Sequence, residues 1–264
     1  MVRFHSLLSG ALLVAIGLFS FSFSKTAAQL DAGTTSAPTA TSTAPYKIMP
    51  LGASSTAGII GSDDGMGYRS KLLALLKSDS SYDPNVTFVG PKKDVSGGYD
   101  AIGGSTILDM LNGGNFMPPL TKVLDTYQPD VILLHAGSND MEPSGDDQDG
   151  QQTADRLTSL LDLIRTQLPN TYVIVTTTQP QNDPVIESRI ETFNDLLVNS
   201  VVPSEAAQGM HIYAIDLHAN VVVPDDYHDW KGDGIHLNDG GYTKFANLWN
   251  DKLQELLPEL LTSR

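Results

Sequence analysis

The 264-residue chain contains no cysteine. This absence excludes disulfide bonds, thiol nucleophiles, zinc fingers with cysteine ligands and iron–sulfur clusters held by thiolates. A domain without disulfides depends on its hydrophobic core for stability. We therefore expect a well-packed domain rather than a small scaffold held together by cross-links.

Basic residues are also scarce. The chain has 16 Lys and Arg against 31 Asp and Glu, which gives a formal net charge of −15. Such a surface repels nucleic acid and anionic membranes, so the sequence predicts neither as a partner of the processed protein. A neutral carbohydrate, including an esterified one, is compatible with this charge.

A long apolar run lies near the N-terminus, at residues 7–23, and small residues follow it. Ser and Gly interrupt the run, which is short for a membrane span. A secretory signal peptide over residues 1–28 is therefore favoured over a membrane anchor. Residues 29–45 are mostly Ala, Ser, Thr and Pro, a composition typical of a flexible linker. We predict a secreted, extracellular protein whose folded domain spans residues 46–264.

Short apolar runs alternate with amphipathic stretches through this domain. The runs predict buried strands at 47–51, 86–89, 130–136, 172–177 and 212–217, and the stretches between them predict helices at 68–76, 153–168, 184–198 and 241–257. This alternation predicts an α/β fold, a three-layer α/β/α sandwich around a mostly parallel sheet of five strands. In such sheets functional residues lie beyond the carboxyl ends of the strands.

A serine follows the first predicted strand almost directly. Gly52 ends the strand, and glycine lets the chain turn sharply, so Ser54 can project above the sheet edge as a nucleophile. Turns of this kind also occur in loops without catalytic function. Ser54 therefore needs support from other residues.

An aspartate and a histidine lie three residues apart near the C-terminus. Asp233 and His236 share a loop with two glycines, so their side chains can meet. The carboxylate can then hold the Nδ1–H of the imidazole and leave Nε2 free as a general base. A solvated loop with a helix cap would contain the same residue types.

Two further segments could bind the oxyanion of an acyl-transfer reaction. Asn139 follows the most hydrophobic predicted strand, and its amide can donate to a developing oxyanion. Gly104 lies in a Gly-Gly turn before a predicted helix, where backbone N–H groups favour anions. Taken alone, each segment is also explained as an ordinary turn.

Together and in this order, these residues resemble the SGNH hydrolases, also called GDSL esterases. That family has a Gly-Asp-Ser block after the first strand, an oxyanion glycine, a Gly-x-Asn-Asp block and a terminal Asp-x-x-His. The matching residues are Ser54, Gly104, Asn139, Asp233 and His236. The resemblance implies a flavodoxin-like fold.

The resemblance also implies a catalytic triad of Ser54, His236 and Asp233. The oxyanion hole would consist of the N–H groups of Ser54 and Gly104 and the side-chain amide of Asn139. The motif at 67–69, Gly-Tyr-Arg, is similar to that of secreted carbohydrate esterases related to acetyl xylan esterases. The implied activity is hydrolysis of short-chain esters, acetyl esters above all, on a carbohydrate or in another small ester substrate. The resemblance implies neither a cofactor nor a metal.

One residue departs from the family pattern, because Ala53 replaces the Asp of Gly-Asp-Ser. We expect this change to affect the rate more than the type of reaction. Two other functions stay open: a lipase-like or lysophospholipase-like esterase, and a catalytically impaired carbohydrate-binding protein. The sequence offers no amphipathic lid for the first, and the retained triad residues argue against the second. It specifies neither the acyl group, the polysaccharide nor the oligomeric state.

The remaining motifs concern modification, metals and substrate. Asn85 begins the only N-glycosylation sequon. The acidic loop at 142–150 lacks the ligand spacing of a calcium-binding loop, and the other histidines lack metal-ligand spacing, so no metal site is predicted. Tyr227, His228 and Trp230 precede the predicted triad loop, where they either line a sugar-binding rim or pack against the loop.

Overall fold

The computed structural model describes residues 45–78, 86–143 and 149–262. The chain divides into two units, residues 1–40 and 41–264, and every described element belongs to the second. The predicted signal peptide, the linker up to residue 44 and the sequon residue Asn85 lie outside the described residues.

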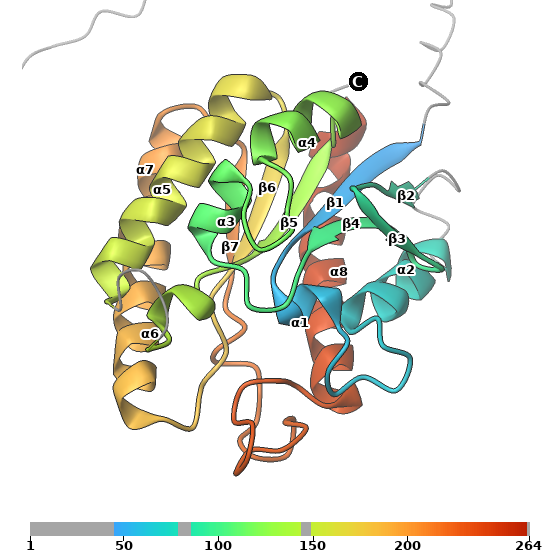
Figure 1. Ribbon diagram of the computed structural model, residues 1–264. Helices are drawn as coiled ribbons and strands as arrows, with labels where there is room; N and C mark the ends of the chain where they lie inside the picture. The colour runs from blue at the N-terminus through green and yellow to red at the C-terminus, as the bar shows by residue number, and fades with distance from the viewer. Residues whose placement is uncertain (1–44, 79–85, 144–148, 263–264) are drawn as a thin grey trace, which may run out of the picture. The chain divides into compact units, whose positions relative to one another are not determined.

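Seven strands form a central sheet (Figure 1). They are β1 (Tyr46–Gly52), β2 (Val86–Phe88), β3 (Lys92–Asp94), β4 (Gly97–Ala101), β5 (Val131–His135), β6 (Tyr172–Thr176) and β7 (Ile212–Ile215). Their order is β3-β4-β1-β5-β6-β7, and β2 also pairs with β1. Only β3 and β4 pair antiparallel among these strands. One edge of β1 carries β2 at residues 46–48 and β4 at residues 51–52.

The helices cover both faces of this sheet (Figure 1). They are α1 (Ser54–Ala57), α2 (Tyr68–Ser78), α3 (Ile107–Asn112), α4 (Leu120–Tyr127), the 3₁₀ turn η1 (Asn139–Met141), α5 (Gly150–Gln167), α6 (Pro184–Leu196), the π-helix η2 (Leu197–Val201), α7 (Val202–Ala207) and α8 (Asp239–Thr262). Helices α2 and α8 pack on one face, and α3 to α7 lie on the other.

Two hydrophobic cores result, one on each face of the sheet. Successive side chains of a strand point to opposite faces. In β5, Val131 and Leu133 accordingly join the core beneath α2 and α8, while Ile132 and Leu134 join the core beneath α3 to α6. All four side chains are buried, which explains why this strand is a continuous apolar run in the sequence.

The predicted three-layer α/β sandwich with a mostly parallel sheet is confirmed. The five predicted strands correspond to β1, β2, β5, β6 and β7. The four helices predicted with residue ranges correspond to α2, α5, α6 and α8, and the helix predicted after Gly104 corresponds to α3. The predicted count of five strands was wrong, because β3 and β4 add an antiparallel hairpin. Its two strands consist of Lys, Asp, Gly, Tyr and Ala, so no apolar run indicates the hairpin in the sequence.

The carboxyl ends of three parallel strands meet at one edge of the sheet. Gly52 at the end of β1 pairs in register with Ala101 of β4 and His135 of β5. The segments that leave these strands therefore start side by side. In the described part of the chain, no helix combines the length and the apolar character needed to cross a membrane.

Candidate active site

Ser54 begins α1 immediately after β1. A Cβ added to Gly52 would lie 2.4 Å from the carbonyl oxygen of His135 and 2.4 Å from Oγ1 of Thr56, so only glycine fits this close approach. Ser54 is the first residue of the helix, so no carbonyl of α1 can accept its backbone N–H. The residue is partly exposed. Ser54 therefore stands at the carboxyl edge of the sheet.

Ala53, which departs from the family pattern, is buried. It is 3 % exposed and belongs to the same apolar cluster as Leu51 and Ile107. A carboxylate at this position would lose hydration among apolar side chains. The apolar surroundings of residue 53 therefore match the alanine found there.

A buried arginine supports α1. Arg69 is 0 % exposed, and it donates from Nε to the carbonyl of Thr56 (2.8 Å) and from Nη2 to that of Ala57 (2.9 Å). Its Nη1 donates to Asp94 and Ser96, each at 2.8 Å. Arg69 therefore satisfies carbonyls of the last turn of α1 and connects this helix to the β3–β4 hairpin.

The loop between β4 and α3 lies beside Ser54. A Cβ added to Gly103 would lie 3.7 Å from the Cβ of Ser54. Gly104 has a φ of +79°, a left-handed conformation that favours glycine. The side chain of Asn115 holds this loop, because its Nδ2 donates to the carbonyl of Gly103 (2.9 Å) and to Oγ of Ser105 (3.0 Å). The structure thus brings the predicted oxyanion loop next to the predicted nucleophile.

Asn139 and Asp140 brace the same loop from the end of β5. Asn139 donates one Nδ2 hydrogen to the carbonyl of Ser105 (2.9 Å), and an amide nitrogen carries a second hydrogen for another acceptor. The buried carboxylate of Asp140 accepts the N–H of Ile107 (3.1 Å) and lies 3.1 Å from Nη1 of Arg156. Burial raises the pKa of Asp140 to about 6, although Ile107 and Arg156 oppose this effect.

Asp233 and His236 meet side chain to side chain. The Asp233 carboxylate lies 2.9 Å from Nδ1 of His236 and also accepts the His236 backbone N–H at 2.8 Å. The His236 residue is 8 % exposed, and its Nε2 is buried without a hydrogen bond to any described residue. A carboxylate at Nδ1 selects the tautomer with a proton there and leaves Nε2 as an acceptor.

A buried glutamine joins the serine and histidine segments. Nε2 of Gln179 donates to the carbonyl of Ile235 (3.0 Å) and to Oγ of Ser55 (3.4 Å). Ser55 and Ile235 are the chain neighbours of Ser54 and His236, so one side chain links both segments. The sequence did not predict Gln179, whose only signal is its position just after β6.

The same glutamine fixes a buried histidine. Oε1 of Gln179 lies 3.0 Å from Nε2 of His135 at the end of β5. Burial lowers the pKa of His135 to about 4, so its imidazole is neutral at pH 7. His135 is thus a structural residue of the sheet edge.

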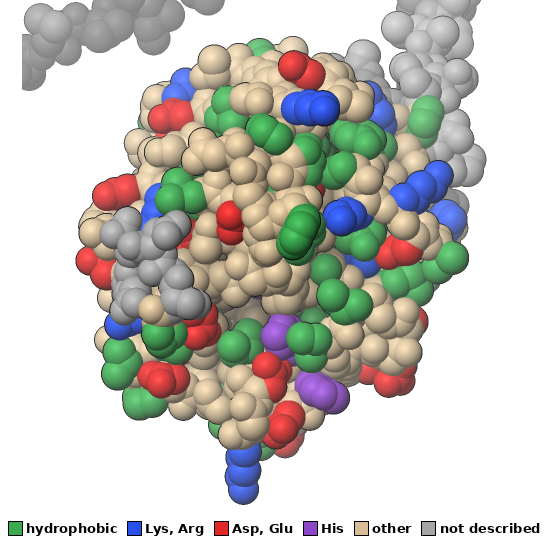
Figure 2. All heavy atoms as spheres, in the orientation of Figure 1, with side chains coloured by type: hydrophobic (Ala, Val, Ile, Leu, Met, Phe, Trp, Pro, Cys, Tyr) green, Lys and Arg blue, Asp and Glu red, His purple; other side chains and the backbone are tan. Residues whose placement is uncertain are grey.

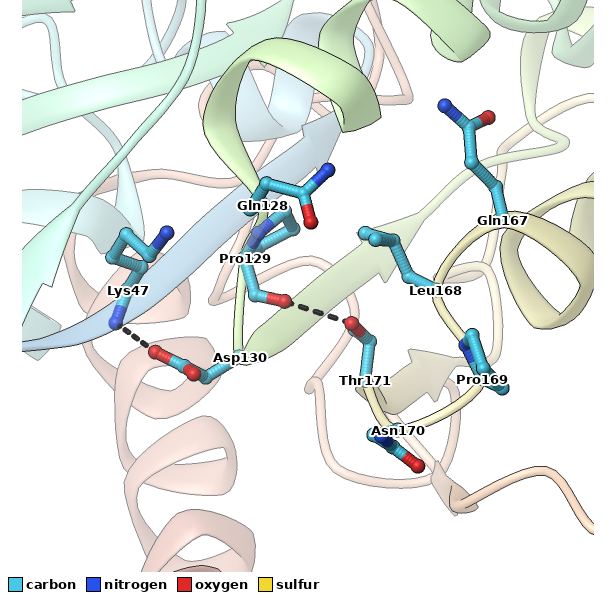
Figure 3. Close-up of a pocket in the computed structure, with 9 residues that line it drawn as sticks. All are labelled: Lys47, Gln128, Pro129, Asp130, Gln167, Leu168, Pro169, Asn170 and Thr171. Carbon is cyan, nitrogen blue, oxygen red and sulfur yellow. Dashed lines mark hydrogen bonds between the residues drawn. The ribbon is translucent and has the colours of Figure 1, made fainter. Parts of the chain in front are cut away.

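A cavity of about 450 Å³ lies at the opposite edge of the sheet, where β1, β5 and β6 begin (Figure 3). The backbone N–H of Lys47 donates to Asp130 (2.7 Å), and Thr171 donates to the carbonyl of Pro129 (2.8 Å). These polar groups are already paired, and none belongs to the segments described above. The candidate site lies instead between α1 and the loop after β7 (Figure 1), where Figure 2 shows histidine side chains close to hydrophobic and acidic ones.

One residue of the predicted aromatic rim, Tyr227, packs inside the domain, whereas Trp230 is partly exposed. Tyr227 is 5 % exposed and donates to the carbonyl of Pro180 (2.6 Å), and its ring lies edge-on to Trp230 with 4.6 Å between centroids. Tyr227 therefore packs against the triad loop and does not line a sugar-binding rim. Among the described residues, no group of three or more His, Asp or Glu side chains is arranged to hold a metal ion.

Comparison with known families gives this site a context. The sequence pattern of the GDSL-like Lipase/Acylhydrolase family matches residues 51–244. This range covers most of the chain and includes Ser54, Asn139 and His236. The chain therefore belongs to the GDSL-like lipase/acylhydrolase family, a class of carboxylic ester hydrolases, and the resemblance seen in the sequence motifs is confirmed.

Individual relatives are carbohydrate esterases and a larger esterase. A multidomain esterase of Ruminococcus flavefaciens is 31% identical over 236 residues, which cover 80% of this chain but only 29% of the relative. The family 3 carbohydrate esterase of Clostridium thermocellum has a structure similar to this one, with a TM-score of 0.65 and 28% identity over 82% of this chain and 99% of that chain. A family 3 carbohydrate esterase from Talaromyces cellulolyticus shares the fold, with a TM-score of 0.64 and 20% identity over 81% of this chain and 99% of that chain.

Proposed function

We propose that the protein is a serine esterase that removes acetyl and similar short-chain groups from carbohydrate esters. Ser54 would be the nucleophile, His236 the general base and Asp233 the residue that orients the base. The Asp233–His236 pair carries this proposal, because the carboxylate 2.9 Å from Nδ1 leaves a buried Nε2 that has no partner among the described residues. Such an imidazole is prepared to accept a proton.

The proposed reaction assigns these residues the following steps. His236 Nε2 takes the hydroxyl proton of Ser54, and the Ser54 Oγ attacks the ester carbonyl carbon. The oxyanion accepts hydrogen bonds from the N–H groups of Ser54 and Gly104 and from the second Nδ2 hydrogen of Asn139. The tetrahedral intermediate expels the alcohol, which receives the proton from His236. Water then attacks the acyl-enzyme by the same path and releases the acid.

Carbohydrate is the alcohol that the relatives support. The Clostridium thermocellum structure is described as a family 3 carbohydrate esterase, and it matches over 99% of its length. A net charge of −15 also suits a neutral polysaccharide better than an anionic lipid surface. A panel of acetylated polysaccharides and oligosaccharides, assayed for acetate release, would identify the natural alcohol.

The nucleophile can be tested by Ser54→Ala. We expect the variant to lose at least about 10³-fold in kcat on p-nitrophenyl acetate, because removing the nucleophile removes the acyl-enzyme path. The thermal unfolding midpoint should stay close to that of the wild type. Ser188→Ala, on the exposed side of α6, is the matched control and should keep full activity. Unchanged turnover in purified Ser54→Ala protein would contradict the proposal.

We also propose that the protein is secreted after cleavage near residue 28, as the apolar run at 7–23 predicts. Expression of the full chain in a secreting host should place the protein in the medium with a new N-terminus near residue 29. N-terminal sequencing of the medium and membrane fractions would check this. Full-length protein retained in the membrane would instead support an anchor.

A further inference from the structure

A groove of about 310 Å³ lies beside the nucleophile. Its lining includes Ala57 from α1, the helix that Ser54 begins, and Gly103 from the oxyanion loop. A Cβ added to Gly103 would lie 3.7 Å from the Cβ of Ser54. The groove therefore lies close to Ser54, and it is much larger than an acetyl group.

An exposed aromatic side chain lines this groove. Phe116 is 91 % exposed, which is unusual for a side chain of this size. Asn115 and Phe116 both have positive φ values, +45° and +63°, which non-glycine residues rarely adopt. Asn115 is held in place by its bonds to Gly103 and Ser105 of the oxyanion loop. Backbone strain that presents an apolar ring to solvent beside a nucleophile indicates a binding function.

The other walls combine apolar surface with one cation. Ile59 lines the groove and is 69 % exposed, and Tyr99 lines it while its ring lies 3.7 Å from the Arg69 guanidinium carbon. Lys92 supplies the charged group among the lining residues, and its Nζ makes no hydrogen bond or ion pair within the described ranges. Apolar walls with a few polar groups are typical of small-molecule sites.

We infer that this groove binds the sugar ring that carries the ester, with Phe116 as its stacking platform. The inference rests on the proposed esterase function. One face of a pyranose ring consists of C–H groups and packs against an aromatic face, while its hydroxyl edge stays hydrated or accepts hydrogen bonds from Lys92. A long acyl chain has no polar edge. In a groove as open as this one, much of the chain would stay in contact with water, which is unfavourable for apolar surface.

Phe116→Ala tests this inference with three esters. The first is the acetylated oligosaccharide that the wild type hydrolyses best, the second is ethyl acetate and the third is ethyl octanoate. We expect kcat/KM for the sugar ester to fall about tenfold, through a higher KM, because the platform contributes ground-state binding. Ethyl acetate has the same acyl group on an alcohol too small to reach Phe116, so its kinetics should change less than about twofold.

Two further variants make the test specific. Phe116→Tyr keeps an aromatic face and should restore the KM for the sugar ester to within about twofold of the wild type. Val185→Ala removes an exposed apolar side chain from α6, outside the groove. It should leave kcat/KM unchanged for all three substrates.

Each other outcome overturns the inference. If Phe116→Ala lowered kcat/KM for ethyl octanoate alone, the groove would bind the acyl chain. An equal decrease in kcat/KM for all three esters would place Phe116 in the catalytic centre. An unchanged kcat/KM for the sugar ester would show that the sugar binds elsewhere. If the wild type hydrolyses ethyl acetate in a Ser54-dependent manner, the esterase proposal survives all three results. A wild type without any esterase activity would contradict both proposals.

Discussion

At the scale of single residues, Arg69 supports both parts of the candidate site. Its guanidinium binds the carbonyls of Thr56 and Ala57 in α1 and lies over Tyr99 in the groove. Asp94 pairs with it at 2.8 Å. Arg69 touches no reacting atom in the proposed mechanism, so it is a positioning residue for the helix that Ser54 begins.

We expect Arg69→Lys to lower kcat on p-nitrophenyl acetate by about tenfold to a hundredfold, with little change in KM. Lysine keeps the charge, but its single nitrogen cannot serve two carbonyls and two side-chain acceptors in the fixed geometry of the guanidinium. A nucleophile displaced by about 1 Å loses this much rate. Steady-state kinetics give kcat and KM separately, which distinguishes misplacement of Ser54 from weaker substrate binding.

Thermal unfolding of the same variant separates positioning from folding. The lost hydrogen bonds should reduce the free energy of unfolding by about 1–3 kcal/mol, and the variant should still be folded at 25 °C. A lower unfolding midpoint together with an unchanged kcat would show that α1 keeps its place without Arg69, and that Arg69 is structural only.

At the scale of elements, the β3–β4 hairpin connects the two parts of the site. It provides Asp94 and Ser96, which hold Arg69, and it provides Lys92 and Tyr99 of the proposed sugar groove. Its strands span only three and five residues. Because backbone pairing rather than an apolar run defines this hairpin, the sequence did not predict it. The groove that the hairpin lines was therefore not predicted either.

The elements that the sequence missed have at most eight residues, and the helices longer than that were all predicted. The apolar face of α5, which contains Leu157, Leu160, Leu161 and Ile164, is fully buried, as its spacing predicts. The N-cap residue of α6, Asp183, accepts the N–H of Val185 at 2.8 Å. Periodicity needs several turns to become visible, and α1, with four residues, offers only one.

At the scale of the whole molecule, a carboxyl group buried in the fold links stability to pH. Asp100 of β4 is 1 % exposed, and its Oδ1 has no hydrogen-bond partner among the described residues. Burial raises the pKa of Asp100 to about 7, and the nearby charge of Lys92 only partly opposes this. In the unfolded chain the same carboxyl has its ordinary pKa near 3.9.

This difference makes folding stability depend on pH. Between about pH 4 and pH 7 the unfolded chain releases the Asp100 proton while the folded domain keeps it, so this group's contribution to stability falls as pH rises and levels off above pH 7. We expect Asp100→Asn, which remains neutral, to match the wild type near pH 4. At pH 8 its free energy of unfolding should exceed that of the wild type by about 2–4 kcal/mol.

Urea unfolding of both proteins from pH 4 to pH 8 measures this difference. Asp225→Asn is the control, because Asp225 is exposed and its substitution should give the same small difference at every pH. A constant difference between Asp100→Asn and the wild type would show that folding does not raise the pKa of Asp100.

The sequence by itself determined the layers of the fold and the residues that carry the proposed chemistry. Apolar runs and helical spacing are local properties, so they indicated β1, β5, β6 and α5 without any knowledge of the tertiary structure. Motif order did the same for Ser54, Asn139 and the Asp233–His236 pair. The last two lie three residues apart, and a short loop can bring them together in any fold that contains it.

Only the tertiary structure decided what holds these residues in place and what lies beside them. Gln179 reaches Ser55 across 124 positions of the chain, and Arg69 reaches Asp94 across 25. Phe116 becomes a groove residue because Asn115 is bonded to Gly103 in the proposed oxyanion loop. Such contacts leave no periodic trace in the sequence, because strand pairing and packing bring their partners together only after the sheet has formed.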